Sequence, residues 1–558
     1  MMRTGGEVLV SQLGAFGVEH VFCVPGESYL AALDAFHDAQ IALTVCRQEG
    51  GAAMMAEAHG KLTGRPGVCF VTRGPGATNA AAGVHVAMQD STPMVLLVGQ
   101  ADRSVLGREA FQELDYRAVF GGLAKWATEV PDASRLPEVL SRAFHIATNG
   151  RPGPVVVALP EDVLTGITDV PDAPPYVISE TAPHPADLLA PERLLATAKR
   201  PLLIAGGSRW DAEAVDRLVA FAEHYDLPVA VTFRRQMLFP ATHSNYAGDL
   251  SVGANPALAA YARSADVVLL LGSRLSEIAS QNYTLLDVPA PRQKLIHVHP
   301  GAGELGRVYR PDVAINTSPR AFLEAASTLA GHRDADRAAA VAEARNIYLR
   351  WSEKPTTVPG SFNLGEVFCQ LRDELPPDTV LTNGAGNYAS WLHRFYRFTR
   401  YGTQLAPTSG SMGYGLPAGV AAARIDPSRR VVVVAGDGCF MMTSQEFATA
   451  VQYDLPVVVV VVDNGMYGTI RMHQEREYPG RTSGTNLRNP DFAAMAVAFG
   501  GHGETVRDTE TFMPAFRRAI ASGKPAIIHC ITDPQALTPG QSLDQIAAGG
   551  RARQAARQ

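Results

Sequence analysis

The chain has 558 residues, 46% hydrophobic and 19% charged, which is the composition of a folded globular protein rather than a fibrous or disordered one. Its 49 Lys and Arg against 55 Asp and Glu give a net charge of −6, which provides no field that would gather nucleic acid or an anionic membrane. Since domains commonly have about 100 to 200 residues, we expect several domains, and the pattern below predicts three.

The N-terminal segment, residues 1–22, reads as an amphipathic helix that leads into a strand. It lacks the uninterrupted apolar region and the cleavage site of a signal peptide. No apolar run approaches the roughly 18 residues needed to span a bilayer. The six cysteines show no CxxC spacing, so we expect reduced thiols in a cytoplasmic protein without nucleic-acid or membrane partners.

Unbroken apolar runs separated by helical patterns recur along the chain, and such runs are typical of strands buried in parallel sheets. The first series is HVFCV, ALTVC, GVCFV, PMVLLVG and GPVVVALP; the second is PLLIA, LPVAVTF, DVVLLLG and KLIHVH; the third is TVLTN, RVVVVAG, LPVVVVVVD and PAIIHCI. We therefore expect an α/β protein with three doubly wound parallel-sheet domains at 1–165, 191–335 and 362–540. Residues 166–190, rich in Pro, Asp and Thr, read as a linker.

Two valine runs of the third series each end on an oxygen-bearing side chain. The run at 431–434 leads into a GDG sequence that contains Asp437, and the run at 457–462 leads into Asn464. Because ligands gather beyond the carboxyl ends of parallel strands, these two side chains should meet. Carboxylate and carbonyl oxygens suit Mg²⁺, and glycines admit a diphosphate, so the pair predicts a metal-diphosphate site. The alternative is a tight turn and a helix cap.

This signature resembles that of thiamine-diphosphate-dependent enzymes, and the resemblance extends over nearly the whole chain, in the order pyrimidine-binding, central and diphosphate-binding domain. Within that family the chain most resembles acetolactate synthase and its relatives. The resemblance implies that Asp437, Asn464 and the backbone oxygen of Met466 hold Mg²⁺. It also implies that ten residues of the third domain bind the cofactor: Ala385, Gly386, Asn387, Tyr388, Met412, Gly436, Gly438, Cys439, Tyr467 and Gly468.

The first domain is expected to supply the catalytic carboxylate. Glu49 follows a predicted strand and precedes a helix of small residues. A glutamate in an apolar site can hydrogen-bond the aminopyrimidine of the cofactor, which then accepts a proton from the thiazolium. The family places its catalytic glutamate here; a surface glutamate at a helix N-terminus is the alternative. The resemblance also assigns Pro25, Pro75 and Asn79 to the cofactor site.

The segment EAFQELDYRAVFGGLAKW resembles the substrate-facing loop of acetolactate synthase, which implies that Phe111 and Gln112 border the reactive carbon of the cofactor and that Lys125 lies nearby. The reaction implied is decarboxylation of pyruvate or a similar 2-oxo acid, followed by joining of the remaining fragment to a second carbonyl compound. Gln112 is accordingly a catalytic candidate.

Two positions depart from acetolactate synthase. Glu27 stands where those enzymes carry glycine and where 2-oxo acid decarboxylases carry an acid, which makes Glu27 a catalytic candidate. His473 stands where they carry a tryptophan that selects the larger acceptor. A 2-oxo acid decarboxylase and a lyase that cleaves 2-hydroxy ketones or 2-hydroxyacyl-CoA therefore stay open as alternatives.

The resemblance also concerns assembly and a further cofactor. Active sites in the family combine residues of two subunits, so we expect a homodimer or homotetramer with active sites at the dimer interface. In the central domain, AGGS at 205–208 and LGSRLSE at 271–277 loosely resemble the FAD-contacting strands of some members, with Arg274 toward a phosphate. FAD, ADP and no ligand at all are the alternatives there, and in the last case Arg274 forms an inter-domain ion pair.

Overall fold

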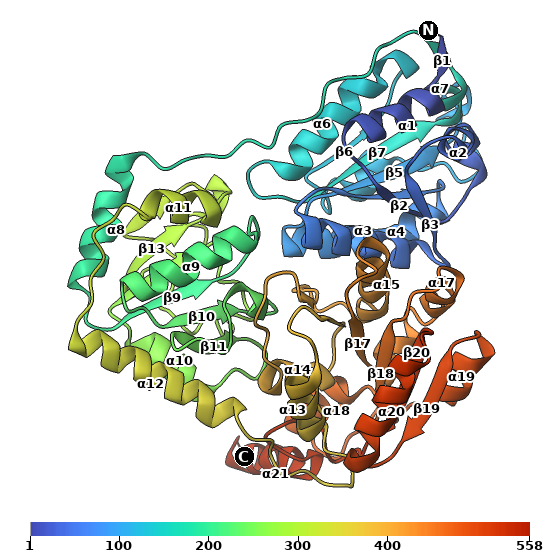
Figure 1. The fold of residues 1–558 in the computed structure, drawn as a ribbon. Helices are drawn as coiled ribbons and strands as arrows, with labels where there is room; N and C mark the ends of the chain where they lie inside the picture. The colour runs from blue at the N-terminus through green and yellow to red at the C-terminus, as the bar shows by residue number, and fades with distance from the viewer. Residues whose placement is uncertain (1, 558) are drawn as a thin grey trace. The chain divides into compact units, whose positions relative to one another are not determined.

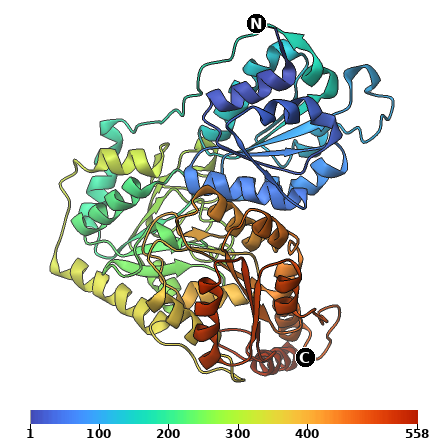
Figure 2. The same ribbon diagram turned by 45° about the vertical axis from the view of Figure 1, so that its right-hand side comes forward.

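The structure is a computed structural model, and it describes residues 2–557. Three sheets of six strands follow one another along the chain, and Figures 1 and 2 show helices on both faces of each sheet. All strand pairs within the three sheets are parallel, which confirms the expected fold class. The described chain divides into two compact units, one made of the residues before Thr181 with Val420–Asp426, the other of Thr181–Gly419 with the described residues from Pro427 onward.

The first sheet has the strand order β3-β2-β4-β5-β7-β6. Its strands are β2 His20–Cys23, β3 Ala42–Val45, β4 Gly67–Val71, β5 Met94–Gln100, β6 Trp126–Glu129 and β7 Pro154–Pro160. The helices are α1 Gly5–Ala15, α2 Leu30–His37, α3 Glu49–Thr63, α4 Pro75–Asp90, α5 Tyr116–Phe120, α6 Leu136–Thr148 and α7 Glu161–Thr165. A small antiparallel pair, β1 Arg3–Thr4 and β8 Ile167–Thr168, joins the N-terminus to the segment expected as a linker.

The second sheet has the order β11-β10-β9-β12-β13-β14. Its strands are β9 Pro201–Ala205, β10 Val229–Thr232, β11 Tyr246–Leu250, β12 Val267–Leu271, β13 Lys294–Val298 and β14 Val313–Ile315. The helices are α8 Pro185–Thr197, α9 Ala212–His224, α10 Pro256–Ser264, α11 Pro319–Ala326 and α12 Ala335–Ser352. Strands β9 and β12 are buried along their whole length, as their unbroken apolar sequences predict.

The third sheet has the order β16-β15-β17-β18-β20-β19. Its strands are β15 Val380–Asn383, β16 Gln404–Leu405, β17 Val431–Gly436, β18 Val458–Asp463, β19 His502–Val506 and β20 Ala526–Ile531. The helices are α13 Leu364–Glu374, α14 Tyr388–Phe395, α15 Gly415–Ile425, α16 Asp437–Met441, α17 Glu446–Gln452, α18 Gly468–Glu477, α19 Phe492–Ala498, α20 Thr509–Ala521 and α21 Leu543–Arg557.

The register of the two valine strands positions the predicted site. Val432 pairs with Val458, and the pairing continues without a shift to Gly436 opposite Val462. Asp437 and Asp463, the next residue on each strand, therefore lie side by side at the carboxyl edge. Buried β-branched residues on both strands hold this register.

No helix within residues 2–557 is both long enough and apolar enough to cross a membrane. All six cysteines are free thiols, and all but Cys369 are buried.

Candidate functional site

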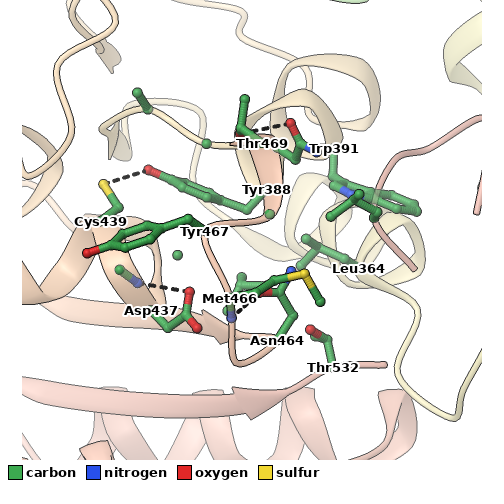
Figure 3. Close-up of a pocket in the computed structure, with 18 of the residues that line it drawn as sticks. Leu364, Tyr388, Trp391, Asp437, Cys439, Asn464, Met466, Tyr467, Thr469 and Thr532 are labelled. Carbon is green, nitrogen blue, oxygen red and sulfur yellow. Dashed lines mark hydrogen bonds between the residues drawn. The ribbon is translucent and has the colours of Figure 1, made fainter. Parts of the chain in front are cut away.

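A cavity of about 260 Å³ lies at the carboxyl edge of the third sheet (Figure 3). All thirteen cofactor and metal candidates of the third domain line it. The remaining lining residues are mostly apolar, and sequence reasoning did not single them out: Phe362, Leu364, Trp391, Gly410, Val462, Thr469, Ile470, Thr532, Ala536 and Leu537. Thr532 directly follows β20, so the same strand-end argument that selected Asp437 would have found it.

Asp437 begins α16 directly after β17 and is 4% exposed. Its Oδ1 accepts a hydrogen bond from the backbone N–H of Gly438 at 2.8 Å, and its Oδ2 accepts one from Asn489 Nδ2 at 2.8 Å. Burial is the main cause that raises the pKa of Asp437 to about 6, and the adjacent negative charge of Asp463 adds to it. A cation bound beside this carboxylate would offset both effects.

The neighbouring carboxylate, Asp463, has a different environment. Asn489 Nδ2 also donates to Asp463 Oδ1 at 2.8 Å, and His529 Nε2 lies 2.9 Å from Asp463 Oδ2. Burial by itself would raise the pKa of Asp463, but the hydrogen bonds from His529, Gly465 and Asn489 outweigh burial and lower this pKa. Sequence reasoning missed Asn489 and His529, because neither lies near the two valine strand ends in the sequence.

The other two metal candidates belong to the loop after β18. Asn464 Oδ1 accepts from the backbone N–H of Met466 at 3.2 Å, which fixes the side-chain amide. Met466 is paired with Asn486 in an isolated bridge, which fixes the backbone of this loop. A carboxylate, an amide oxygen and a backbone carbonyl are the hard oxygen donors that Mg²⁺ accepts together with phosphate, so the donor set fits a metal-bound diphosphate.

The N-termini of α14 and α18 face the same cavity, with Asn387 before α14 and Gly468 at the start of α18. Thr469 Oγ1 donates to Asn387 Oδ1 at 2.9 Å, which ties the two helix starts together (Figure 3). Free backbone N–H groups at helix N-termini suit the phosphates of a diphosphate. Residues at both helix starts thus fit the group that the sequence predicted.

The glycines of this cavity are packed closely by two tyrosines. A methyl group added to Gly436 would lie 2.9 Å from the Tyr388 ring, and one added to Gly438 would lie 2.5 Å from the Tyr467 ring. Tyr388 OH lies 3.2 Å from the sulfur of Cys439, and burial raises the pKa of this phenol well above its usual range. A side chain at Gly436 or Gly438 would therefore displace the tyrosine ring beside it.

In the first domain, Glu49 begins α3 directly after the loop that follows β3. Its Oε2 accepts from Asn79 Nδ2 at 3.0 Å, and a methyl group on Gly76 would lie 3.5 Å from its Oε1. Pro75 is the first residue of α4, the helix that carries Asn79. The structure thus brings Glu49 and Asn79 together, whereas Pro25 is exposed in the loop after β2.

Glu27 begins a short 3₁₀ turn, Glu27–Tyr29, after β2. Phe111 and Gln112 lie in the segment after β5; the Phe111 side chain is 69% exposed, and Gln112 has a positive φ of 62°. Lys125 does not join them. It directly precedes β6 and so lies at the amino edge of the sheet, whereas Phe111 and Gln112 follow the carboxyl end of β5. Its ammonium group donates to the backbone oxygens of Ile146 and Asn149, so the expectation that it lies near the reacting carbon is wrong.

The glycines of the central domain that resemble flavin-contacting residues are closely packed by protein atoms. A methyl group on Gly207 would lie 1.8 Å from the backbone oxygen of Gly272, and one on Gly206 would lie 2.1 Å from Thr232 Oγ1. Trp210 Nε1 also donates to the backbone oxygen of Gly206 at 2.8 Å. The space beside these glycines is filled by neighbouring protein atoms, so the glycines themselves give a flavin no room. The assignment of Arg274 to a ligand phosphate stays a prediction.

Comparison with known proteins covers all three domains. Residues 3–119, 192–326 and 384–530 match the N-terminal TPP binding domain, the central domain and the C-terminal TPP binding domain of thiamine pyrophosphate enzymes. Among similar proteins, the acetolactate synthase large subunit of Parasynechococcus marenigrum is 34% identical, covering 94% of this chain and 87% of that protein. The acetolactate synthase isozyme 2 large subunit of Escherichia coli is 31% identical over 95% of each chain.

A third relative is also similar over nearly its full length. The probable acetolactate synthase large subunit of Methanocaldococcus jannaschii is 30% identical, covering 98% of this chain and 94% of that protein. The similarity therefore spans the N-terminal, central and C-terminal domains in that order along the chain. The matched length includes the pocket of the third sheet and the Glu49 loop of the first. On these matches, the chain belongs to the thiamine pyrophosphate enzyme family.

Proposed function

We propose that the chain is a carboligase of the acetolactate synthase type that depends on thiamine diphosphate and Mg²⁺. It decarboxylates pyruvate or a similar 2-oxo acid and joins the remaining fragment to a second carbonyl compound. The observation that carries the proposal is the convergence of Asp437, Asn464 and Met466 in one cavity, in a chain whose full length resembles acetolactate synthases. When bound, thiamine diphosphate supplies the carbon nucleophile and accepts the electron pair that carbon dioxide leaves behind.

The residues of the chain have separate tasks in this proposal. Asp437, Asn464 and the Met466 carbonyl hold the cation, which in turn binds the diphosphate. Glu49 accepts a hydrogen bond from Asn79, which orients its carboxyl group, and it holds a proton at the ring nitrogen of the aminopyrimidine. The apolar part of the cavity excludes water from the bound group.

We further propose a homodimer whose active sites combine the Glu49 loop of one subunit with the third-domain cavity of its partner. Three apolar side chains of the third domain are exposed, Met441 at 44%, Met442 at 48% and Ile470 at 54%; Ile470 lines the cavity, and association would cover such side chains. Sedimentation of the purified protein measures its oligomeric state, and a monomer that is active at nanomolar concentration would contradict the shared site. The six free thiols support a cytoplasmic location.

The test is to incubate the purified protein with pyruvate, Mg²⁺ and thiamine diphosphate and to measure acetolactate and acetaldehyde. We expect acetolactate as the main product; acetaldehyde alone would support the decarboxylase alternative, which the exposed Glu27 favours. Two variants serve as controls for each other. Glu49→Gln should retain cofactor binding and lose about 100-fold or more in turnover, whereas Asp437→Ala should lose cofactor binding first.

A further inference from the structure

Arg73 lies next to the position between β2 and β4 at which the strand order of the first sheet reverses. In the order β3-β2-β4-β5-β7-β6, the chain continues from β2 to β3 on one side and from β4 to β5 on the other. Glu27 follows β2 and Arg73 follows β4, so the two residues lie on either side of the position between these neighbouring strands. Ligands of open parallel sheets bind in the crevice at such a position.

Two carboxylates hold the Arg73 guanidinium, whose side chain is only 10% exposed. Nη1 donates to Glu161 Oε1 in a short contact, and Nη2 donates to Glu27 Oε1 at 3.3 Å. The Glu161 side chain is 36% exposed and that of Glu27 is 64% exposed. Glu161 therefore fixes the guanidinium, which in turn restrains the more exposed Glu27.

The same guanidinium lies against the segment expected to face the substrate. Its central carbon is 5.9 Å from the centre of the Phe111 ring, and a methyl group on the adjacent Gly74 would lie 2.8 Å from Gln112 Cβ. The backbone N–H of Gly74 also donates to Tyr116 OH at 2.9 Å, which anchors this end of the segment. Arg73 is thus the residue at which Glu27 and the Phe111–Gln112 segment meet.

The hydrogen-bond chemistry of Arg73 limits what Glu27 can do. An arginine side chain only donates, so the Glu27 oxygen that faces it is the acceptor of this contact and is held toward Arg73. Once carbon dioxide has left, the reacting carbon holds an electron pair with two outcomes. It takes a proton from an acid, which yields an aldehyde, or it bonds to a second carbonyl carbon, whose oxygen then takes the proton. A nearby carboxylic acid favours the first outcome.

We propose that Arg73 is a positioning residue that determines product specificity: it restrains Glu27 as an acceptor and thereby favours carboligation over aldehyde release. This inference rests on the proposed function. Glu161 supports the same effect from a distance, because it contacts Arg73 rather than Glu27.

The experiment measures the molar ratio of acetaldehyde to acetolactate formed from pyruvate at saturating Mg²⁺ and thiamine diphosphate. Arg73→Met keeps an unbranched side chain and removes the donors, and we expect the ratio to rise roughly two- to fivefold, the size of one partly exposed ion pair. Glu161→Gln should change the ratio in the same direction by less. Arg73→Lys, which keeps the charge, should stay near the wild-type ratio, and it tests the inference if Arg73→Met does not fold.

The double variant Arg73→Met with Glu27→Gln separates the proposal from a purely structural role. If Glu27 delivers the extra protons, the double variant returns to the wild-type ratio. A wild-type carboligase whose ratio is the same in Arg73→Met, or whose raised ratio persists in the double variant, overturns the inference alone. A wild-type protein that forms neither product overturns the proposed function as well.

Discussion

Acid should destabilise the third domain through His393, which is buried in α14 at 7% exposure. Burial, together with the nearby positive charge of Arg234, lowers the pKa of His393 from 6.5 to about 3. The unfolded chain therefore takes up a proton as the pH falls below 6.5, whereas the folded domain does not do so until about pH 3. The contribution of neutral His393 to the free energy of unfolding is fully present above pH 6.5. Below pH 6.5 the free energy of unfolding falls by about 1.4 kcal/mol per pH unit, which amounts to a loss of about 2 kcal/mol at pH 5.

The assay compares urea unfolding of wild type and His393→Gln at pH 7.5 and pH 5. Both proteins carry phenylalanine at the other three tryptophans, so that Trp391, in the same helix, reports on this domain. Other acid effects are shared and cancel, so wild type should lose about 2 kcal/mol more than the variant between the two pH values. Equal losses would refute the reasoning. Since α14 begins at the predicted cofactor loop, cofactor binding should weaken in acid as well.

Three further variants test single contacts. Asn489→Ala removes a hydrogen bond to Asp437 and should weaken Mg²⁺ binding, measured by calorimetry with thiamine diphosphate present, by about tenfold or more; an unchanged affinity would contradict the positioning role. Arg234→Met removes the donor that reaches the backbone oxygen of Gly384 at 2.8 Å and should cost about 2 to 4 kcal/mol in urea unfolding. Lys61→Met removes an ammonium group bound to two buried carboxylates and should cost about 3 to 5 kcal/mol, detected by unfolding of the first domain.

The strand pattern could be predicted from the sequence where a strand is an unbroken apolar run. The valine strands β17 and β18 are fully buried, so their sequences are unbroken apolar runs, and their ends identify the edge where ligands gather. The edge strands β6, β11, β14, β16 and β19 were not predicted. Strands β11 and β16 are mostly buried, but their sequences, YAGDL and QL, are not apolar runs. The other three share a different feature. Each is partly exposed, as HGETV in β19 illustrates, and a half-exposed strand need not be apolar.

The individual contacts of the candidate site were less predictable than its location. Asn489 reaches the two carboxylates from a loop before α19, and His529 reaches one of them from β20. Neither residue has a distinguishing motif, because their positions depend on which strands become neighbours. Lys125 shows that closeness in the sequence does not guarantee closeness in the fold. It follows Phe111 by a short segment, yet the intervening α5 returns the chain to the amino edge of the sheet, where β6 begins.

The two carboxylates at the ends of β17 and β18 differ in their surroundings, and this difference bears on which of them would bind the proposed metal ion. Both carboxylates are buried, and both accept from the same amide of Asn489. Of these two carboxylates only Asp463 pairs with His529, whose hydrogen bond helps to lower the pKa of Asp463. Burial and the negative charge of Asp463 raise the pKa of Asp437, and the neutral donors Gly438 and Asn489 offset this rise only in part. A cation that binds here gains most beside the carboxylate whose charge is least compensated. In the proposed site, Asp437 is therefore the carboxylate whose charge a bound Mg²⁺ would compensate, and Asp463 belongs to the framework that holds it.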